Sequence, residues 1–89
     1  MDFADLDKVG VLERVVHLPV TEWSYKGHNG ERHIGPVAED FYQTFGLGSD
    51  DKYIGGSDAS GVALAAIQGL YELVQELQAE VKELRAGLR

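Results

Sequence analysis

The sequence has four serines that could act as nucleophiles, and it has no cysteine. A serine hydroxyl becomes a useful nucleophile only when a base such as histidine or lysine lies beside it. None of the four has such a base at a recognisable distance, and all lie in expected strand or loop segments: Ser24, Ser49, Ser57 and Ser60. The residues themselves therefore predict a protein without a serine active site.

The sequence predicts neither a metal site nor a phosphate site. The histidines lack the spacing of metal ligands, and the aspartates of a glycine-rich loop lack the alternating oxygen ligands and terminal glutamate of an EF-hand. The glycine-rich segments match neither phosphate-binding fingerprint. The residues concerned are His17, His28 and His33, then Asp50, Asp51 and Asp58, and the glycines of 27–35 and 46–61. We expect no metal and no cofactor.

The size and charge of the chain restrict its partners. A monomer of 89 residues has one small domain and buries only about 60% of its unfolded surface. No disulfide can add stability, so other copies of the chain or a partner must contribute. The formal net charge of −7 argues against nucleic acid and anionic lipid. No apolar run reaches the roughly 20 residues of a membrane span, so no membrane contact is expected.

The first element expected is a short helix from Val9. Asp5 or Asp7 can cap it, and it must end before Pro19, which cannot continue a helix. Its apolar stripe consists of Val11, Leu12, Val15 and Val16.

A β-hairpin is expected next. Thr21, Trp23 and Tyr25 would share one face of its first strand, and residues 32–35 read as the returning strand. Residues 26–31 form the turn, because their Asn-Gly pair tolerates the positive φ angles of a tight hairpin.

A second helix should start with Pro36 as its first residue and stop at Gly46, which suits a left-handed cap. The segment Leu47–Gly61 is rich in glycine, serine and aspartate and reads as an irregular loop. The predicted core side chains are Trp23, Phe41 and Phe45.

The last third of the chain carries a heptad repeat. Apolar residues alternate spacings of three and four over about three heptads, which is typical of a coiled-coil seam. The seam consists of Ile67, Leu70, Val74, Leu77, Val81, Leu84 and Leu88. The alternative is an amphipathic helix packed on its own domain. A helix of about 28 residues is about 40 Å long, however, and the short upstream part cannot cover all of it.

Orientation and copy number follow from the positions that flank the seam. In a parallel pairing Glu80 faces Arg85 of the next chain, and the opposite charges favour parallel strands. Valine at a with leucine at d favours dimers, whereas Tyr71 at e and Leu73 at g widen the apolar face as a trimer requires. Both copy numbers stay open at this point. Upstream small residues would let other elements approach closely: Gly61, Ala63, Ala65, Ala66 and Gly69.

Three segments together resemble the C-terminal intramolecular chaperone domain of endosialidases and phage tail spikes, the peptidase S74 family. They are LPVTEWSYKG, RHIGPVAEDFYQTFGLG and DASGVALAAIQGLYELVQEL. The resemblance extends from about Val11 to Leu77. Two parts of it fit in order and spacing: the helix start from Gly61 to Leu70, and a turn formed by Arg32, His33, Ile34, Gly35 and Pro36.

The resemblance implies an α+β fold with a small helical base, a short β-hairpin and a long C-terminal helix that forms a parallel trimeric coiled coil. Residues 1–61 would be the base with its client-facing loop, and residues 62–89 the oligomerisation helix. The partners implied are two further copies of the chain and an upstream β-helical stalk of its own parent chain. Such a domain trimerises the stalk of a tail spike or tail fibre in the host cell cytoplasm during phage assembly. It is then released from the mature virion by autoproteolysis.

The sequence departs from the family at the cleavage site. The family's serine and its lysine five residues on belong just before the first helix, where this chain begins. Ser57 opens the expected dipeptide, but the next lysine is Lys82, and Ser49 lies only three residues before Lys52. We therefore expect no enzymatic activity from these residues. A permanently attached trimerisation cap and an active self-cleaving serine protease are the alternatives.

Two assignments stay open at the level of sequence. His33 either hydrogen-bonds within the base or belongs to the self-cleavage site of the parent. Either the loop 47–61 or the hairpin tip 26–31 contacts the client, and the resemblance favours the longer loop.

Overall fold

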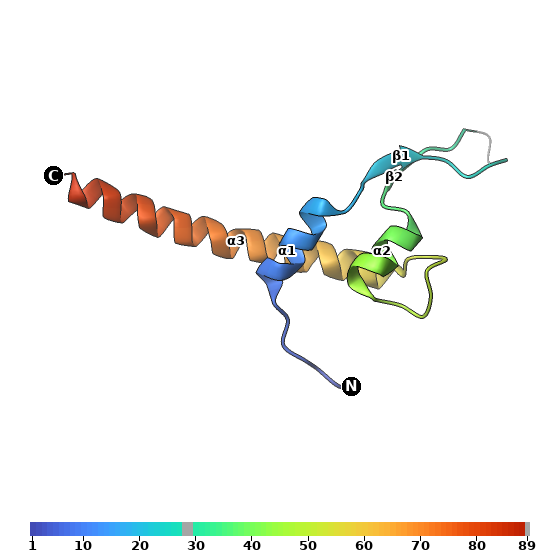
Figure 1. The fold of residues 1–89 in the computed structure, drawn as a ribbon, viewed down its shortest axis with the longest axis horizontal. Helices are drawn as coiled ribbons and strands as arrows, with labels where there is room; N and C mark the ends of the chain where they lie inside the picture. The colour runs from blue at the N-terminus through green and yellow to red at the C-terminus, as the bar shows by residue number, and fades with distance from the viewer. Residues whose placement is uncertain (28–29, 89) are drawn as a thin grey trace. The chain divides into compact units, whose positions relative to one another are not determined.

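The computed structural model describes residues 1–27 and 30–88 and has the expected α+β fold (Figure 1). Its elements are α1 (Lys8–His17), β1 (Thr21–Trp23), β2 (His33–Gly35), α2 (Ala38–Phe45) and α3 (Gly56–Gly87). None of the described helices combines the length and the hydropathy needed to cross a membrane.

The chain forms two compact units. One contains Met1–Val15 with the chain from Gly61 onward, and the other contains Val16–Ser60. The predicted boundary between residues 61 and 62 lies one residue after the boundary of the units in α3. The prediction differs in placing the first helix in the base. That division concerns function and stays a prediction.

In the first unit, α1 begins at a capping aspartate. Of the two candidates, Asp7 is the cap: its Oδ1 accepts a hydrogen bond from the Gly10 amide at 3.1 Å, and its carbonyl accepts from the Val11 amide at 3.0 Å. The helix ends at His17, two residues before Pro19, as predicted. Val11 is its buried side chain.

Gly69 of α3 lies directly against the first residues of α1. A Cβ at this position would be 2.7 Å from the Lys8 carbonyl carbon and 3.1 Å from the Val9 nitrogen, so only glycine fits without a shift of backbone. Ala65 and Ala66, one turn earlier, are buried as well. Ala65, Ala66 and Gly69 therefore allow the close approach that their size predicts, whereas Gly61 and Ala63 are exposed.

The long helix begins earlier than expected. The structure starts α3 at Gly56, so the predicted loop 47–61 is too long and ends at Gly55. The Ala59 amide donates to the Gly55 carbonyl at 3.0 Å, and Asp58 lies in the first turn. An acidic side chain there interacts favourably with the helix N-terminus, which offsets the poor helix propensity of the glycines.

In the second unit, β1 and β2 form an antiparallel pair with Thr21 opposite Gly35 and Trp23 opposite His33. The hairpin is confirmed, but the ladder is shorter than predicted: Tyr25 and Arg32 lie beyond it. Gly27 and Gly30 have positive φ angles, as a turn needs. His28 and the asparagine of the Asn-Gly pair lie outside the described residues.

The second helix starts two residues later than predicted. Val37 is the N-cap, with an extended backbone (φ −81°, ψ 151°), so Pro36 precedes the helix instead of opening it. Gly46 ends α2 in the left-handed conformation, as predicted, and its amide donates to the Tyr42 carbonyl at 2.7 Å. Among the three predicted core aromatics, Phe41 is buried at 3% exposure, whereas Trp23 and Phe45 are half-buried.

Candidate oligomerisation interface

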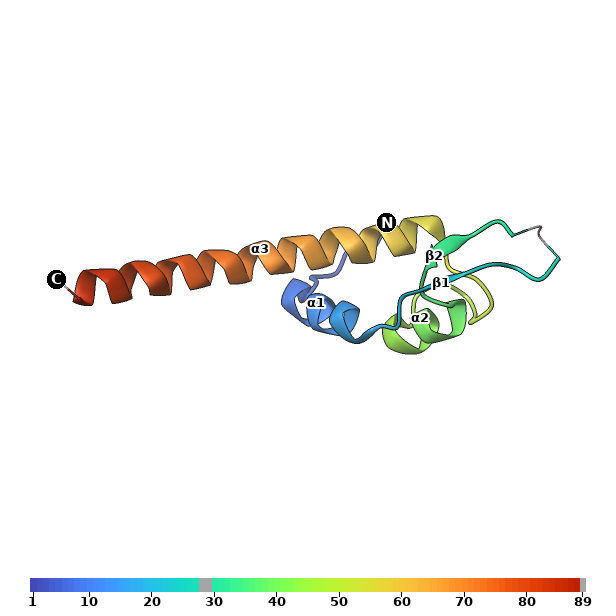
Figure 2. The same cartoon turned by 90° about the horizontal axis from the view of Figure 1, so that it is seen from above.

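The predicted seam lies along α3 and is exposed in the single chain. Fractional exposure of its residues runs from 38% at Val81 to 87% at Leu88. The full set is Ile67, Leu70, Val74, Leu77, Val81, Leu84 and Leu88. The first six lie in one continuous helix (Figure 2), and Leu88 follows its last residue. Their heptad spacing therefore places them in a single stripe. An apolar stripe of this length on a water-exposed helix is typical of an interaction surface.

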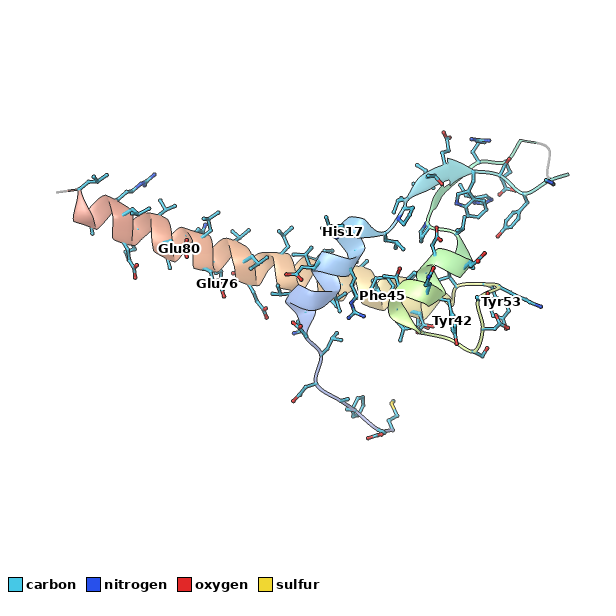
Figure 3. All side chains as sticks on the ribbon, viewed as in Figure 1. His17, Tyr42, Phe45, Tyr53, Glu76 and Glu80 are labelled. Atoms are coloured by element: carbon cyan, nitrogen blue, oxygen red, sulfur yellow. The ribbon has the colours of Figure 1, made fainter. Side chains whose placement is uncertain are left out.

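The described part of α3 beyond Gly69 is not covered by its own chain. Every described residue from 70 to 88 is exposed, and Figure 3 shows side chains extending outward along this stretch, with Glu76 and Glu80 labelled. Glu80 and Arg85 are exposed beside the seam, so both charges are available to a neighbouring helix. The alternative of a helix packed on its own domain therefore has no structural counterpart over these residues.

The apolar surface is wider than the seam itself at its start. Leu64 and Tyr71 at e positions are exposed, and Leu73 at a g position is exposed to a smaller extent, at 38%. The Tyr71 hydroxyl accepts a hydrogen bond from Gln75 Nε2 at 3.0 Å, which keeps its polar end in water. Further along, the equivalent e positions hold Gln78 and Arg85.

The five residues of the family motif, Arg32 to Pro36, include strand β2 and contact other residues of the second unit. Arg32 Nε lies 3.7 Å from Glu22 Oε1, and its Nη1 donates to Ser24 Oγ at 3.5 Å. His33 packs on Trp23 with ring centroids 4.9 Å apart and lies 3.9 Å from the Glu31 carboxylate. Of the two roles open for His33, the described contacts are those of a residue packed within the base.

The other three residues of that turn also occupy defined positions. The Gly35 carbonyl accepts a hydrogen bond from Trp23 Nε1 at 3.3 Å, which ties the indole across the hairpin. Ile34 is exposed to solvent. Pro36 lines a groove of about 420 Å³ that sequence reasoning did not anticipate.

This groove lies between the hairpin and the loop 47–61, the segment favoured as the client contact. One wall comes from the hairpin and the start of α2, and the other comes from the loop before α3. Its lining residues are Trp23, Tyr25, Pro36, Val37, Ala38, Lys52, Tyr53 and Ile54. Its walls are mainly apolar and aromatic, with few polar groups. The signal in the sequence was the isolated Tyr53-Ile54 pair within an otherwise polar loop.

The contacts of the described residues form no catalytic constellation. The Ser24 hydroxyl accepts from an arginine, which does not activate a nucleophile. Within residues 1–27 and 30–88, no three histidine, cysteine, aspartate or glutamate side chains are grouped as metal ligands would be.

Comparison with protein families gives a match over the N-terminal half of the chain. The family model Peptidase_S74, described as chaperone of endosialidase, matches residues 1–46. The matched part ends at the left-handed cap of α2 and includes α1 and the hairpin. No curated protein and no solved structure matches the chain.

Proposed function

The chain belongs to the peptidase S74 family, the chaperones of endosialidases, and on that premise we propose that it is an intramolecular chaperone. It trimerises through the seam of α3 and holds three copies of an upstream β-helical stalk in register while they fold. The exposed stripe from Ile67 to Leu88 carries the proposal, since it needs other helices to cover it. The base, residues 1–61, contacts the client, and residues 62–89 form the parallel bundle.

The chaperone role follows physically from the bundle. A slip of one residue turns every side chain of a β-strand to the wrong face, so three stalk chains must be aligned before they pair. Tethering their C-terminal ends gives each chain an effective concentration near the millimolar range. Long-range β pairing is slow because loop-closure entropy is lost first, and a clamp that fixes register speeds the productive path.

Three copies are favoured over two. Leu64, Tyr71 and Leu73 extend the apolar surface beyond the a and d positions, and a trimer buries more of the flanking positions than a dimer does. The charges of Glu80 and Arg85 support a parallel arrangement.

Release of the chaperone belongs to the parent protein. Autoproteolysis in this family uses a serine and a lysine upstream of the first helix, and this sequence does not contain that pair. Without its clamp the finished stalk could not refold once unfolded, which would make it kinetically stable. A cap that stays attached is the second candidate, and a parent sequence without a serine at the cleavage position would favour it. The proposed location is the host cell cytoplasm during phage assembly.

Two measurements test the proposal. Light scattering of the purified chain should give three times the chain mass of 9.7 kDa. Fusion of the chain behind a trimeric β-helical stalk that lacks its own chaperone should yield soluble trimeric stalk. The same fusion with Leu77→Ala and Leu84→Ala should not. A monomeric mass, or equal stalk yield from both fusions, contradicts the proposal.

A further inference from the structure

The segment before α1 exposes large apolar side chains. Met1, Phe3 and Leu6 are all exposed, Phe3 at 84%, and they alternate with the charged Asp2 and Asp5. Figure 1 shows this segment extending away from the ribbon of α3. The N-terminal arm, residues 1–6, therefore carries apolar surface that its own unit does not cover.

A complementary surface lies on α3 beside the seam. Leu64 and Tyr71 occupy successive e positions and are 60% and 63% exposed. These two side chains lie outside the a and d positions, so they form the outer apolar flank of the face that the proposed trimer uses. The flank is confined to the start of the helix, because the next e positions hold Gln78 and Arg85.

The contact at Gly69 fixes where the arm begins. Gly69 occupies a c position, and the Lys8 carbonyl lies against it. On a helix the c position borders the g flank, and Ala66 at g is buried too. The arm therefore leaves α1 on the g side of α3, at the level of the first two heptads, whereas Leu64 and Tyr71 lie across the seam on the e side.

In a parallel coiled coil, the g flank of one helix faces the e flank of the next. The arm of one chain thus starts beside the Leu64 and Tyr71 flank of its neighbour. Five extended residues from Lys8 to Phe3 span about 17 Å, and packed helix axes are only about 10 Å apart. The arm reaches the neighbour without moving α1.

We infer that the N-terminal arm of each chain packs Phe3 and Leu6 against Leu64 and Tyr71 of a second copy. This inference rests on the parallel oligomer proposed above. It gives each copy a contact outside the seam, so the first two heptads are held by arm and seam together.

Cysteine crosslinking tests the contact, since the chain has no cysteine of its own. A Phe3→Cys chain with a mass tag and an untagged Tyr71→Cys chain are refolded together and oxidised. A disulfide-linked heterodimer is expected on a non-reducing gel. Glu72→Cys is the matched control, because its f position faces away from the seam. Equal heterodimer yield from Tyr71→Cys and Glu72→Cys overturns the inference.

A second crosslinking experiment distinguishes a contact between neighbouring chains from a contact within one chain. A chain carrying both Phe3→Cys and Tyr71→Cys is diluted into excess cysteine-free chain, so its neighbours offer no thiol. No intrachain disulfide is expected, and its formation shows that the arm packs on its own helix and overturns the inference.

A stability readout does not depend on disulfide chemistry. Phe3→Ala with Leu6→Ala should raise the dissociation midpoint about a hundredfold, because each of the two apolar side chains removed from a contact costs about a decade in affinity. Asp2→Ala with Asp5→Ala is the control and should leave the midpoint nearly unchanged. If the chain is a trimer and the arm variant dissociates at the same midpoint as the unchanged chain, this inference alone is overturned. A monomeric mass at all concentrations overturns the proposed function, and the arm contact with it.

Discussion

The two stretches of α3 in the first unit, before and after Leu70, differ in whether the chain covers them. From Gly61 to Gly69 the covered residues are small, namely Ala65, Ala66 and Gly69. From Leu70 onward the residues are large and apolar at every seam position, and all of them are exposed. A folded monomer would cover the leucines and expose the alanines. The difference shows that the first stretch is covered by its own chain and the second is not, as the proposed oligomer requires.

The largest effect should come from the exposed stretch. Leu77→Ala with Leu84→Ala should dissociate the oligomer, because each buried leucine contributes roughly 2–5 kcal/mol and the loss is repeated in every subunit. Sedimentation measures the mass. Glu76→Ala with Glu83→Ala changes neighbouring exposed positions outside the seam and should leave the mass unchanged. An unchanged mass in the leucine variant would refute the seam.

A core change in the second unit should act on that unit only. Phe41 is buried, and Phe41→Ala should cost about 3–5 kcal/mol of unfolding free energy there. The fluorescence of Trp23, the single tryptophan, reports this unit, and the oligomer mass should persist. Ile34→Ala, at an exposed position, is the control. Loss of the oligomer in the Phe41 variant would show that the seam depends on the base.

The covered stretch can be tested through two glycines of the same helix. Gly69→Ala places a Cβ into the backbone of Lys8 and should destabilise the unit by about 1–3 kcal/mol. Gly61→Ala meets nothing within 4 Å and should stabilise the helix by up to about 1 kcal/mol. Thermal melting followed by circular dichroism compares them. Equal melting temperatures would mean that α1 does not pack at Gly69.

The smallest effect concerns helix orientation. Arg85→Glu places like charges opposite Glu80 in a parallel bundle and should cost a few tenths of a kcal/mol per contact. The exchange Glu80→Arg with Arg85→Glu should restore stability, and added salt should reduce the difference between variants. Chemical denaturation at low and high salt measures these changes. If the exchange variant is as weak as the single variant, the bundle is not parallel.

Local chemistry explains which elements were predictable. Asp7, Pro19 and Gly46 act through nearest neighbours, so the limits of α1 and the end of α2 follow from residue types. The start of α3 was missed because its first turn consists largely of glycine and serine, which normally favour a loop, and Asp58 overrides them. Pro36 was misplaced because Val37, not the proline, adopts the capping conformation.

The sequence alone determined that α3 carries a seam, because a heptad period is a property of spacing along one helix. For catalysis it gives only a prediction, that these residues hold no nucleophile–base pair. Only the tertiary structure decided which small residues are covered and that hairpin and loop line one groove. These depend on contacts between segments far apart in the chain, such as Lys8 with Gly69, and no spacing rule encodes which backbone will lie against which.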